Sequence, residues 1–91
     1  MTGSMDDVLE RMFHFQKTLR EFTASFADTV AEMQRRHDEV SPQWQDKFRR
    51  EYDLHWEVLQ REIDLFLKTR APQYDDFLTN KLRALTSYLN Q

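Results

Sequence analysis

A single interruption at Ser41-Pro42 divides an otherwise helical sequence into two long amphipathic stretches. Ser41 can serve as an N-cap, because its hydroxyl is able to accept a hydrogen bond from an unpaired backbone N–H at a helix start. Pro42 fits the first helical position, since it lacks an N–H and its φ is fixed near the helical value. Trp44, Phe48 and Tyr52 then recur every four residues and share one helix face. We therefore predict the elbow of a helical hairpin here, formed by Ser41, Pro42, Trp44, Asp46, Phe48 and Tyr52.

Turn-forming residues are too few for an all-β fold. The 91 residues include one glycine, two prolines and no cysteine. Tight β-turns depend on glycine and proline, so the chain is predicted to be all-α. Without cysteine, disulfides, thiolate zinc sites and catalytic thiols are excluded. The length allows one small domain. We predict a single helical-hairpin domain over residues 5–91, preceded by residues 1–4 as a cloning remnant or a disordered N-terminus.

The first predicted arm, residues 5–40, carries inward residues at steps that alternate between three and four. This spacing is typical of a heptad seam, along which one helix packs against another. The steps Phe22-Phe26-Val30 break the alternation and indicate a single stutter. The predicted inward residues are Met5, Val8, Met12, Phe15, Leu19, Phe22, Phe26, Val30, Met33, His37 and Val40.

The second predicted arm starts at Pro42 and continues past Pro72 to about residue 90. Its apolar stripe passes through Pro72 nearly in phase, which favours a kink in one long helix. The residue before a proline resists the α conformation, which favours a break instead. We predict an antiparallel hairpin with a proline-kinked second arm, with a three-helix bundle as the alternative. The stripe comprises Trp44, Phe48, Tyr52, His55, Trp56, Leu59, Ile63, Phe66 and Leu67, then Tyr74, Phe77, Leu78, Leu82, Leu85, Tyr88 and Leu89.

The predicted arms differ in length, and the difference indicates a partner interface. Arms paired antiparallel about Ser41 would bring the start of the first arm opposite Phe77. The stripe beyond that point would then have nothing of its own chain to cover it, and exposed apolar patches usually mark interfaces. We therefore predict a homodimer, or a heterodimer with a related helical protein, that pairs through Leu78, Leu82, Leu85, Tyr88 and Leu89.

The three histidines, His14, His37 and His55, do not form a predicted metal site. In the antiparallel arrangement they lie at three different levels, and His37 is expected to meet Trp44 at the elbow. The Glu-x-x-His pairs of di-iron bundles are absent from the sequence. Glycine-rich phosphate loops and Gly-x-Ser-x-Gly elbows are absent as well. We expect no catalytic residue, no metal, no cofactor and no small-molecule substrate, so the chain is predicted not to be an enzyme.

Charge does not point to a nucleic acid or a membrane as the partner. The 13 basic and 16 acidic residues give a formal net charge of −3, which is too balanced for either. Near the elbow, acidic residues interleave with Arg35, Arg36, Lys47, Arg49 and Arg50, which predicts a solvated, salt-bridged tip. No apolar run approaches the roughly 20 residues of a membrane span, and no cleavable signal peptide is predicted. We expect a cytoplasmic protein, or one exported without such a signal.

The elbow carries a family resemblance. Trp44-x-Asp46, followed by Phe48 and Tyr52, stands mid-chain between two long amphipathic arms. This arrangement resembles the Trp-x-Gly family of small bacterial helical hairpins, which are substrates and partners of type VII secretion. The chain departs from the family pattern in two places. Asp46 stands where the family has glycine, and the export signal Tyr-x-x-x-Asp/Glu is missing, since Tyr74 is followed by Leu78.

The leading hypothesis for function is a non-enzymatic protein-interaction module. The resemblance implies a coiled-coil hairpin that acts as the dimeric partner or adaptor of a larger effector. A cytoplasmic helical scaffold or accessory subunit, unrelated to secretion, is the alternative with the same shape. A helical-bundle enzyme or metal carrier is the hypothesis from a different class, and elemental analysis would test it.

Overall fold

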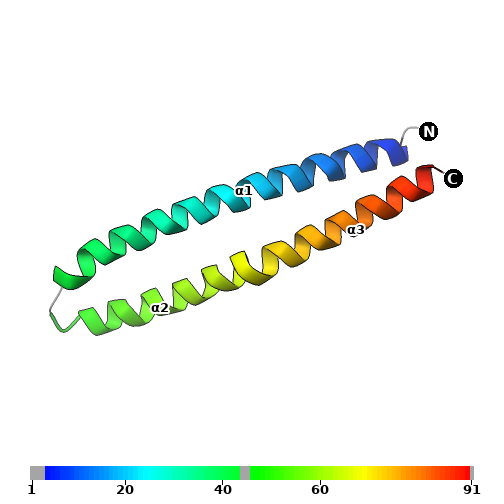
Figure 1. Cartoon of the computed structure of the whole chain (residues 1–91). Coiled ribbons are helices and arrows are strands. Elements are labelled where there is room, and N and C mark those ends of the chain that lie inside the picture. Colours follow the sequence, from blue (N-terminus) through cyan, green and yellow to red (C-terminus); the bar gives the residue numbers. More distant parts are fainter. Residues whose placement is uncertain (1–3, 44–45, 91) are drawn as a thin grey trace.

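The computed structural model describes residues 4–43 and 46–90, and this part of the chain is all-helical. Helix α1 (Ser4–Val40) forms the first arm. A short 3-10 helix, η1 (Ser41–Gln43), follows it. The second arm contains α2 (Arg49–Leu65), the π-helical turn η2 (Phe66–Arg70) and α3 (Ala71–Leu89) in series. Figure 1 shows that this second arm runs back alongside α1, so that the start of α1 lies near the end of α3.

Helix α1 is unbroken because residues 4–40 contain neither glycine nor proline, and Asp6 and Asp7 in its first turn suit the helix dipole. Its inward side differs from the predicted one. Gln16 is only 6% exposed, whereas Phe15 and Phe22, both predicted inward, are 52% and 53% exposed. The inward residues follow a strict alternation of three and four with no stutter, and they are Leu9, Met12, Gln16, Leu19, Thr23, Phe26, Val30, Met33 and His37.

The connection between the arms is longer than predicted. Helix α2 begins at Arg49, so the predicted helix start at Pro42 is wrong, and Pro42 lies in the 3-10 helix. Asp46 organises the start instead: its Oδ1 accepts a hydrogen bond of 2.9 Å from the Phe48 N–H. Its main-chain oxygen accepts a second bond, of 3.1 Å, from the Arg49 N–H. The predicted roles of Trp44 and of the Ser41 hydroxyl lie outside the described residues.

The helical backbone of the second arm continues through Pro72 without interruption. The residues at the junctions, including Phe66, Arg70 and Ala71, all keep right-handed helical dihedral angles. A proline lacks an N–H, and its ring collides with the carbonyl four residues earlier, here that of Lys68. The π-helical turn just before it relieves this conflict, because the Ala71 N–H donates to the Phe66 oxygen one residue further back than in an α-helix.

The longer connection shifts the register of the two arms. His37 contacts Tyr52, and Phe15 contacts Tyr74, so α1 faces residues roughly two helical turns further along than predicted. The start of α1 therefore reaches the end of α3. Leu78 is buried, Leu82, Leu85 and Leu89 are half-buried, and only Tyr88 of the predicted interface is exposed. The expected overhang beyond Phe77 is wrong, and it no longer supports an interface at these residues.

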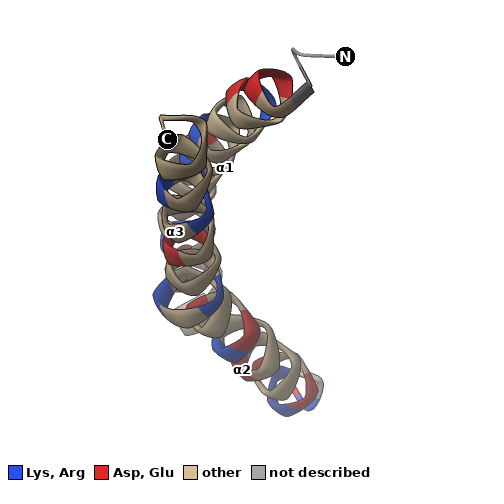
Figure 2. Ribbon diagram, turned by 90° about the vertical axis from the view of Figure 1, so that its right-hand side faces the viewer, with Lys and Arg blue, Asp and Glu red and all other residues tan. Residues whose placement is uncertain are grey.

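The two arms form a thin, extended layer. The chain measures 66 × 18 × 16 Å, and its radius of gyration is 20.1 Å, against about 12 Å for a compact domain of this length. Figure 2, turned by 90°, shows that the layer is curved along its length. In the described residues no helix is both long and apolar enough to cross a membrane.

Candidate interaction surface

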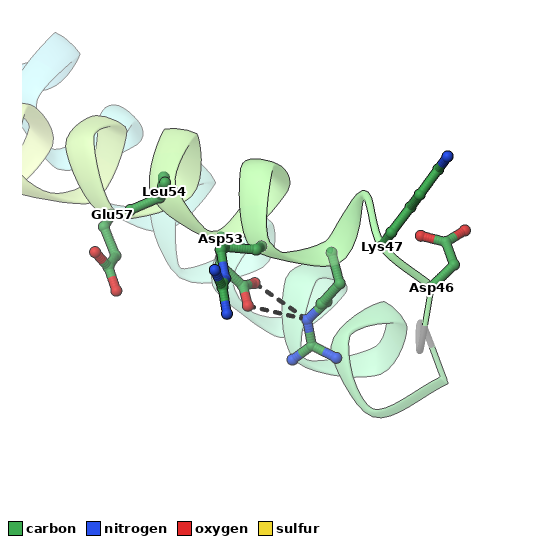
Figure 3. Close-up of a pocket in the computed structure, with 7 residues that line it drawn as sticks. Asp46, Lys47, Asp53, Leu54 and Glu57 are labelled. Carbon is green, nitrogen blue, oxygen red and sulfur yellow. Dashed lines mark hydrogen bonds and ion pairs between the residues drawn. The ribbon is translucent and has the colours of Figure 1, made fainter.

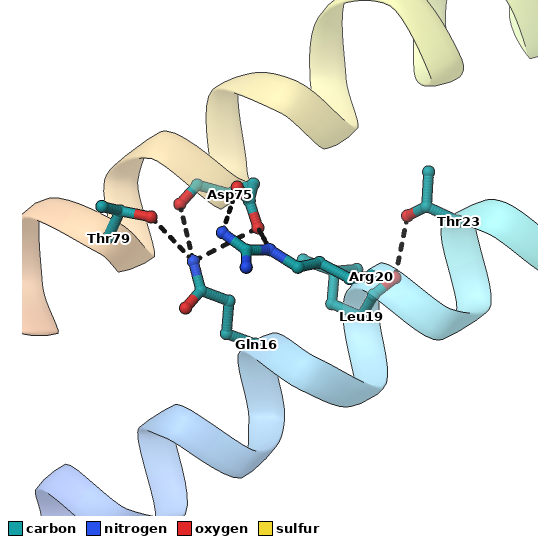
Figure 4. Close-up of polar contacts among 6 residues, drawn as sticks. All are labelled: Gln16, Leu19, Arg20, Thr23, Asp75 and Thr79. Atoms are coloured by element: carbon teal, nitrogen blue, oxygen red, sulfur yellow. Dashed lines mark hydrogen bonds and ion pairs between the residues drawn. The ribbon is translucent and has the colours of Figure 1, made fainter.

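A polar cluster of Gln16, Arg20, Asp75 and Thr79 joins α1 to α3 (Figure 4). The Gln16 amide nitrogen donates to the Thr79 hydroxyl at 2.8 Å, and to the main-chain oxygen and Oδ1 of Asp75 at 3.3 and 3.2 Å. The Arg20 Nε donates to Asp75 Oδ1 at 2.7 Å, and a terminal nitrogen donates to Oδ2 at 3.0 Å. This forked geometry fixes both side chains, so the cluster specifies the register of α1 on α3.

The polar cluster also perturbs its own ionisation. The hydrogen bonds from Arg20 lower the pKa of the Asp75 carboxyl below its ordinary value, against an opposing effect of partial burial. The same hydrogen bonds raise the pKa of Arg20. Both shifts favour the charged forms, so the pair is suited to holding the arms together rather than to exchanging protons.

A second contact between the arms lies near the connection. His37 stacks on Trp56 with ring centroids 4.2 Å apart, and its Nδ1 is hydrogen-bonded to the Tyr52 hydroxyl at 2.8 Å. Tyr52, predicted as an elbow residue, is thus half-buried between the arms. The predicted contact of His37 with Trp44 lies outside the described residues.

The tip beside the connection is charged and open. Seven residues line a hollow of about 690 Å³ there: Asp46, Lys47, Arg49, Arg50, Asp53, Leu54 and Glu57 (Figure 3). The Arg49 Nε lies 3.1 Å from Asp53 Oδ2, and on α1 Glu32 pairs with both Arg35 and Arg36. The tip therefore mixes both signs of charge in ion pairs, in agreement with the predicted salt-bridged tip.

The histidines stand apart from one another. His14 lies 3.8 Å from Glu10 on an exposed part of α1, His37 lies between the arms, and His55 is exposed on α2. Across residues 4–43 and 46–90, no three potential metal ligands gather in one place. The described histidines thus give no candidate metal centre.

One side of the layer is lined by aromatic rings from both arms. Phe22 stacks on Phe26 with ring centroids 5.7 Å apart. Both rings meet Phe66 edge to face, with centroid distances of 6.2 Å from Phe22 and 5.6 Å from Phe26. Phe15 meets Tyr74 edge to face at 6.2 Å, and the Tyr74 and Phe77 rings lie 5.8 Å apart. We call this surface the aromatic face; it comprises Phe15, Phe22, Phe26, Phe66, Tyr74 and Phe77.

The aromatic face is open to solvent although its rings touch one another. Phe15, Phe22, Tyr74 and Phe77 are each about half exposed, at 52%, 53%, 48% and 49%. Large aromatic side chains bury more area than any others when they are covered, so leaving four of them open forgoes much hydrophobic stabilisation. The sequence pattern identified these residues as apolar, but it predicted that Phe15 and Phe22 lie between the arms.

The opposite side of the layer is shaped by small side chains. A groove of about 440 Å³ runs between the arms there, flanked by Leu19 and Leu67 and also lined by the Arg20–Asp75 pair. We call it the small-residue groove; its floor and walls comprise Thr23, Ala24, Ala27, Ala71 and Pro72. The layer therefore has two chemically different sides.

The exposed area of the whole chain is large for its mass. The accessible surface is 7,444 Å², whereas a compact protein of 11.1 kDa exposes about 5,650 Å². Among the described residues, only Ile63, Ala71 and Leu78 form a buried apolar core, and each of them keeps a small exposed fraction. The excess, about 1,800 Å², exceeds the roughly 800 Å² that each partner buries in a standard interface. The single chain is thus incompletely covered.

Comparison of the chain with models of known families, with curated proteins and with solved structures finds no match.

Proposed function

We propose that this protein is a non-enzymatic interaction module whose core is completed by a helical partner. The observation that carries the proposal is the open aromatic face on a layer with an excess of exposed surface. A contiguous apolar surface of this kind is typical of an interface rather than of a free monomer. In the described part of the chain, the two groups with shifted pKa values, Arg20 and Asp75, are paired with each other across the arms.

The proposed module is an antiparallel hairpin with a bent second arm, rather than a three-helix bundle. The polar cluster supports this form, because it joins residues 16 and 20 of α1 to residues 75 and 79 of α3 in an extended register. X-ray scattering in solution tests it. The hairpin predicts a radius of gyration near 20.1 Å, or larger if hairpins associate, whereas a folded-back bundle approaches about 12 Å.

The resemblance to Trp-x-Gly hairpins extends the proposal to a role as dimeric partner or adaptor of a larger effector in type VII secretion. Support comes from the Trp44-x-Asp46 pair between two arms and from Asp46 at the start of α2. Asp46 performs through its side chain and main-chain oxygen what a glycine turn achieves by conformational freedom. A scaffold unrelated to secretion would have the same hairpin and the same need for a partner.

The test is the mass and composition of the complex purified from the protein's native source. The proposal expects at least two helical chains in one particle, of which one is this chain. Recovery of the chain alone, at 11.1 kDa, would contradict the interaction module. The identity of the second chain separates the two versions: a secretion component supports the adaptor, and any other protein supports the scaffold.

A further inference from the structure

We infer that the aromatic face is covered by the aromatic face of a second copy of this chain, giving a two-fold-symmetric bundle of four helical arms. This inference rests on the proposed interaction module and names its partner. It assigns the interface to the side of the layer that carries Phe15, Phe22 and Tyr74, and leaves the small-residue groove outside it.

The position of the aromatic face suits a two-fold interface. In α1 the face runs from Phe15 to Phe26, and α1 itself runs from Ser4 to Val40, so the face lies near the middle of the arm. A two-fold axis through the middle of the layer, near Phe22, therefore lays the face of one copy on the same face of the other. Two-fold dimers use the same patch on both copies, and only a self-complementary patch meets that requirement.

The chemistry of the aromatic face is also self-complementary. Its rings already pack edge to face within one chain, and half-exposed rings such as Phe22 and Tyr74 offer free edges and faces to further rings. The Lys81 Nζ lies 5.5 Å from the centre of the Phe77 ring, at the terminal end of the face. A second aromatic face matches this surface better than a charged one would.

The areas agree with this arrangement. A standard interface removes about 800 Å² of accessible surface from each partner. The chain exposes about 1,800 Å² more than a compact protein of its mass, so one such interface is easily supplied by the excess. The remaining excess reflects the elongated shape, which a four-arm bundle reduces but does not abolish.

Light scattering on the full-length purified chain is the first measurement. At concentrations of tens of micromolar, the inference expects a mass of about 22 kDa, twice the 11.1 kDa of one chain. A mass of 11.1 kDa for a folded helical protein would overturn pairing with a second copy.

A matched pair of double substitutions then locates the interface. Phe15→Glu with Phe22→Glu places charge on the aromatic face and is expected to halve the mass while the circular dichroism spectrum keeps a helical shape. Leu54→Glu with Val58→Glu is the control, because these side chains are equally exposed, at 57% and 52%, but lie on α2 outside the aromatic face. The control is expected to stay dimeric. Loss of the dimer only in the control would place the interface elsewhere and overturn the inference.

A crosslink keeps the test decisive if the first variant does not fold. The chain has no cysteine, so Phe22→Cys introduces a single thiol close to the inferred axis. Under mild oxidation it is expected to form a disulfide-linked dimer, whereas Leu54→Cys under the same conditions is not. A Phe22→Cys chain that stays uncrosslinked, or a Leu54→Cys chain that crosslinks equally well, would overturn the inference.

The outcomes separate this inference from the proposed function. If the purified chain is a monomer but the complex from the native source contains another helical protein, pairing with a second copy is wrong and the proposed interaction module is supported. If the chain is a folded monomer in both preparations, both fail. The purified chain could also be a dimer that is unchanged by Phe15→Glu with Phe22→Glu and that is not crosslinked through Phe22→Cys. In that case the interaction module is supported, but the assignment of the interface to the aromatic face is wrong.

Discussion

The two halves of the layer join the arms in different ways. In the terminal half, where α1 meets α3, the backbones approach closely, and the polar cluster and Leu78 fill the space between them. In the turn half, where α1 meets α2, the helices lie further apart and large rings such as His37 and Trp56 span the gap. The separation of packed helices follows the size of the side chains between them.

This difference indicates which half contributes more to folding stability and to the register of the two arms. The terminal half combines a buried apolar residue with hydrogen bonds that only one register satisfies. The turn half relies on ring stacking, and it leaves a small cavity of about 60 Å³ that Val30, Trp56 and Ile63 help to line. The side chains that line this cavity lack protein packing partners on that side. We therefore expect substitutions in the terminal half to cost more than comparable ones in the turn half.

The largest effect is expected from Leu78→Ala. Leu78 is 4% exposed, and truncation of a buried leucine usually lowers the free energy of unfolding by about 2–5 kcal/mol. Urea unfolding at fixed protein concentration measures the change, with Leu54→Ala as the exposed control. If the two variants lost equal free energy of unfolding, Leu78 would not be a major source of stability in the terminal half.

Trp56→Ala is expected to come second. Trp56 is half-buried, and it contributes a stacked ring as well as area, so a loss of about 2 kcal/mol is expected. Trp56→Phe should restore part of that loss, because a ring again lies against His37. A loss larger than that of Leu78→Ala in the same urea experiment would reverse the comparison of the two halves.

Gln16→Ala and Gln34→Ala form a matched pair, one glutamine in each half. Gln16 is buried and donates to three oxygens on α3, so its loss is expected to cost about 1–2 kcal/mol. Gln34 is hydrogen-bonded to Gln60 in the turn half and is less buried, so about 0.5 kcal/mol is expected. Thermal melts of the two variants compare the halves directly. A larger drop in melting temperature for Gln34→Ala than for Gln16→Ala would contradict the expectation that the terminal half is more sensitive.

Acid should produce the smallest effect, through the Arg20–Asp75 pair of the terminal half. Because hydrogen bonds from Arg20 lower the folded-state pKa of Asp75, its stabilising contribution is complete above the ordinary value of 3.8. That contribution is lost as the pH falls below 3.8 and through the lowered folded-state pKa, where the carboxylate takes up a proton. Melting temperatures between pH 5 and pH 2.5 should therefore fall more steeply for the natural chain than for Asp75→Asn. Parallel curves would show that the Arg20–Asp75 pair does not couple to folding.

Sequence patterns were sufficient for the all-helical class and for the placement of the connection near residue 41. They failed on the inward side of α1, because ranking by hydrophobicity favours Phe15 over Gln16. Gln16 is buried since its amide finds Thr79 and Asp75, and those partners are about sixty residues away in the chain. The strict three-and-four alternation from Leu9 to His37 was the local signal that could have identified it.

The start of α2 was missed for a similar reason. Ser41-Pro42 is a good local start signal, but Asp46 competes for the same role and lies closer to the residues that form the helix. Either choice satisfies local preferences, and the contact of His37 with Tyr52 and Trp56 distinguishes them. The interface predicted at the chain's end was argued from the predicted register, so the overhang no longer supports it.

The π-helical turn at Phe66–Arg70 also acts as a phase corrector. The three buried apolar residues of the second arm are Ile63, Ala71 and Leu78, and the first interval is one residue longer than a heptad. In a uniform α-helix that extra residue would rotate everything after it by about 100° about the helix axis. The wide turn absorbs the residue, so Tyr74 and Phe77 stay on the same side as Phe66. Removing one residue from the turn would restore the seven-residue interval, so the arm could continue as a regular α-helix with both halves still in phase.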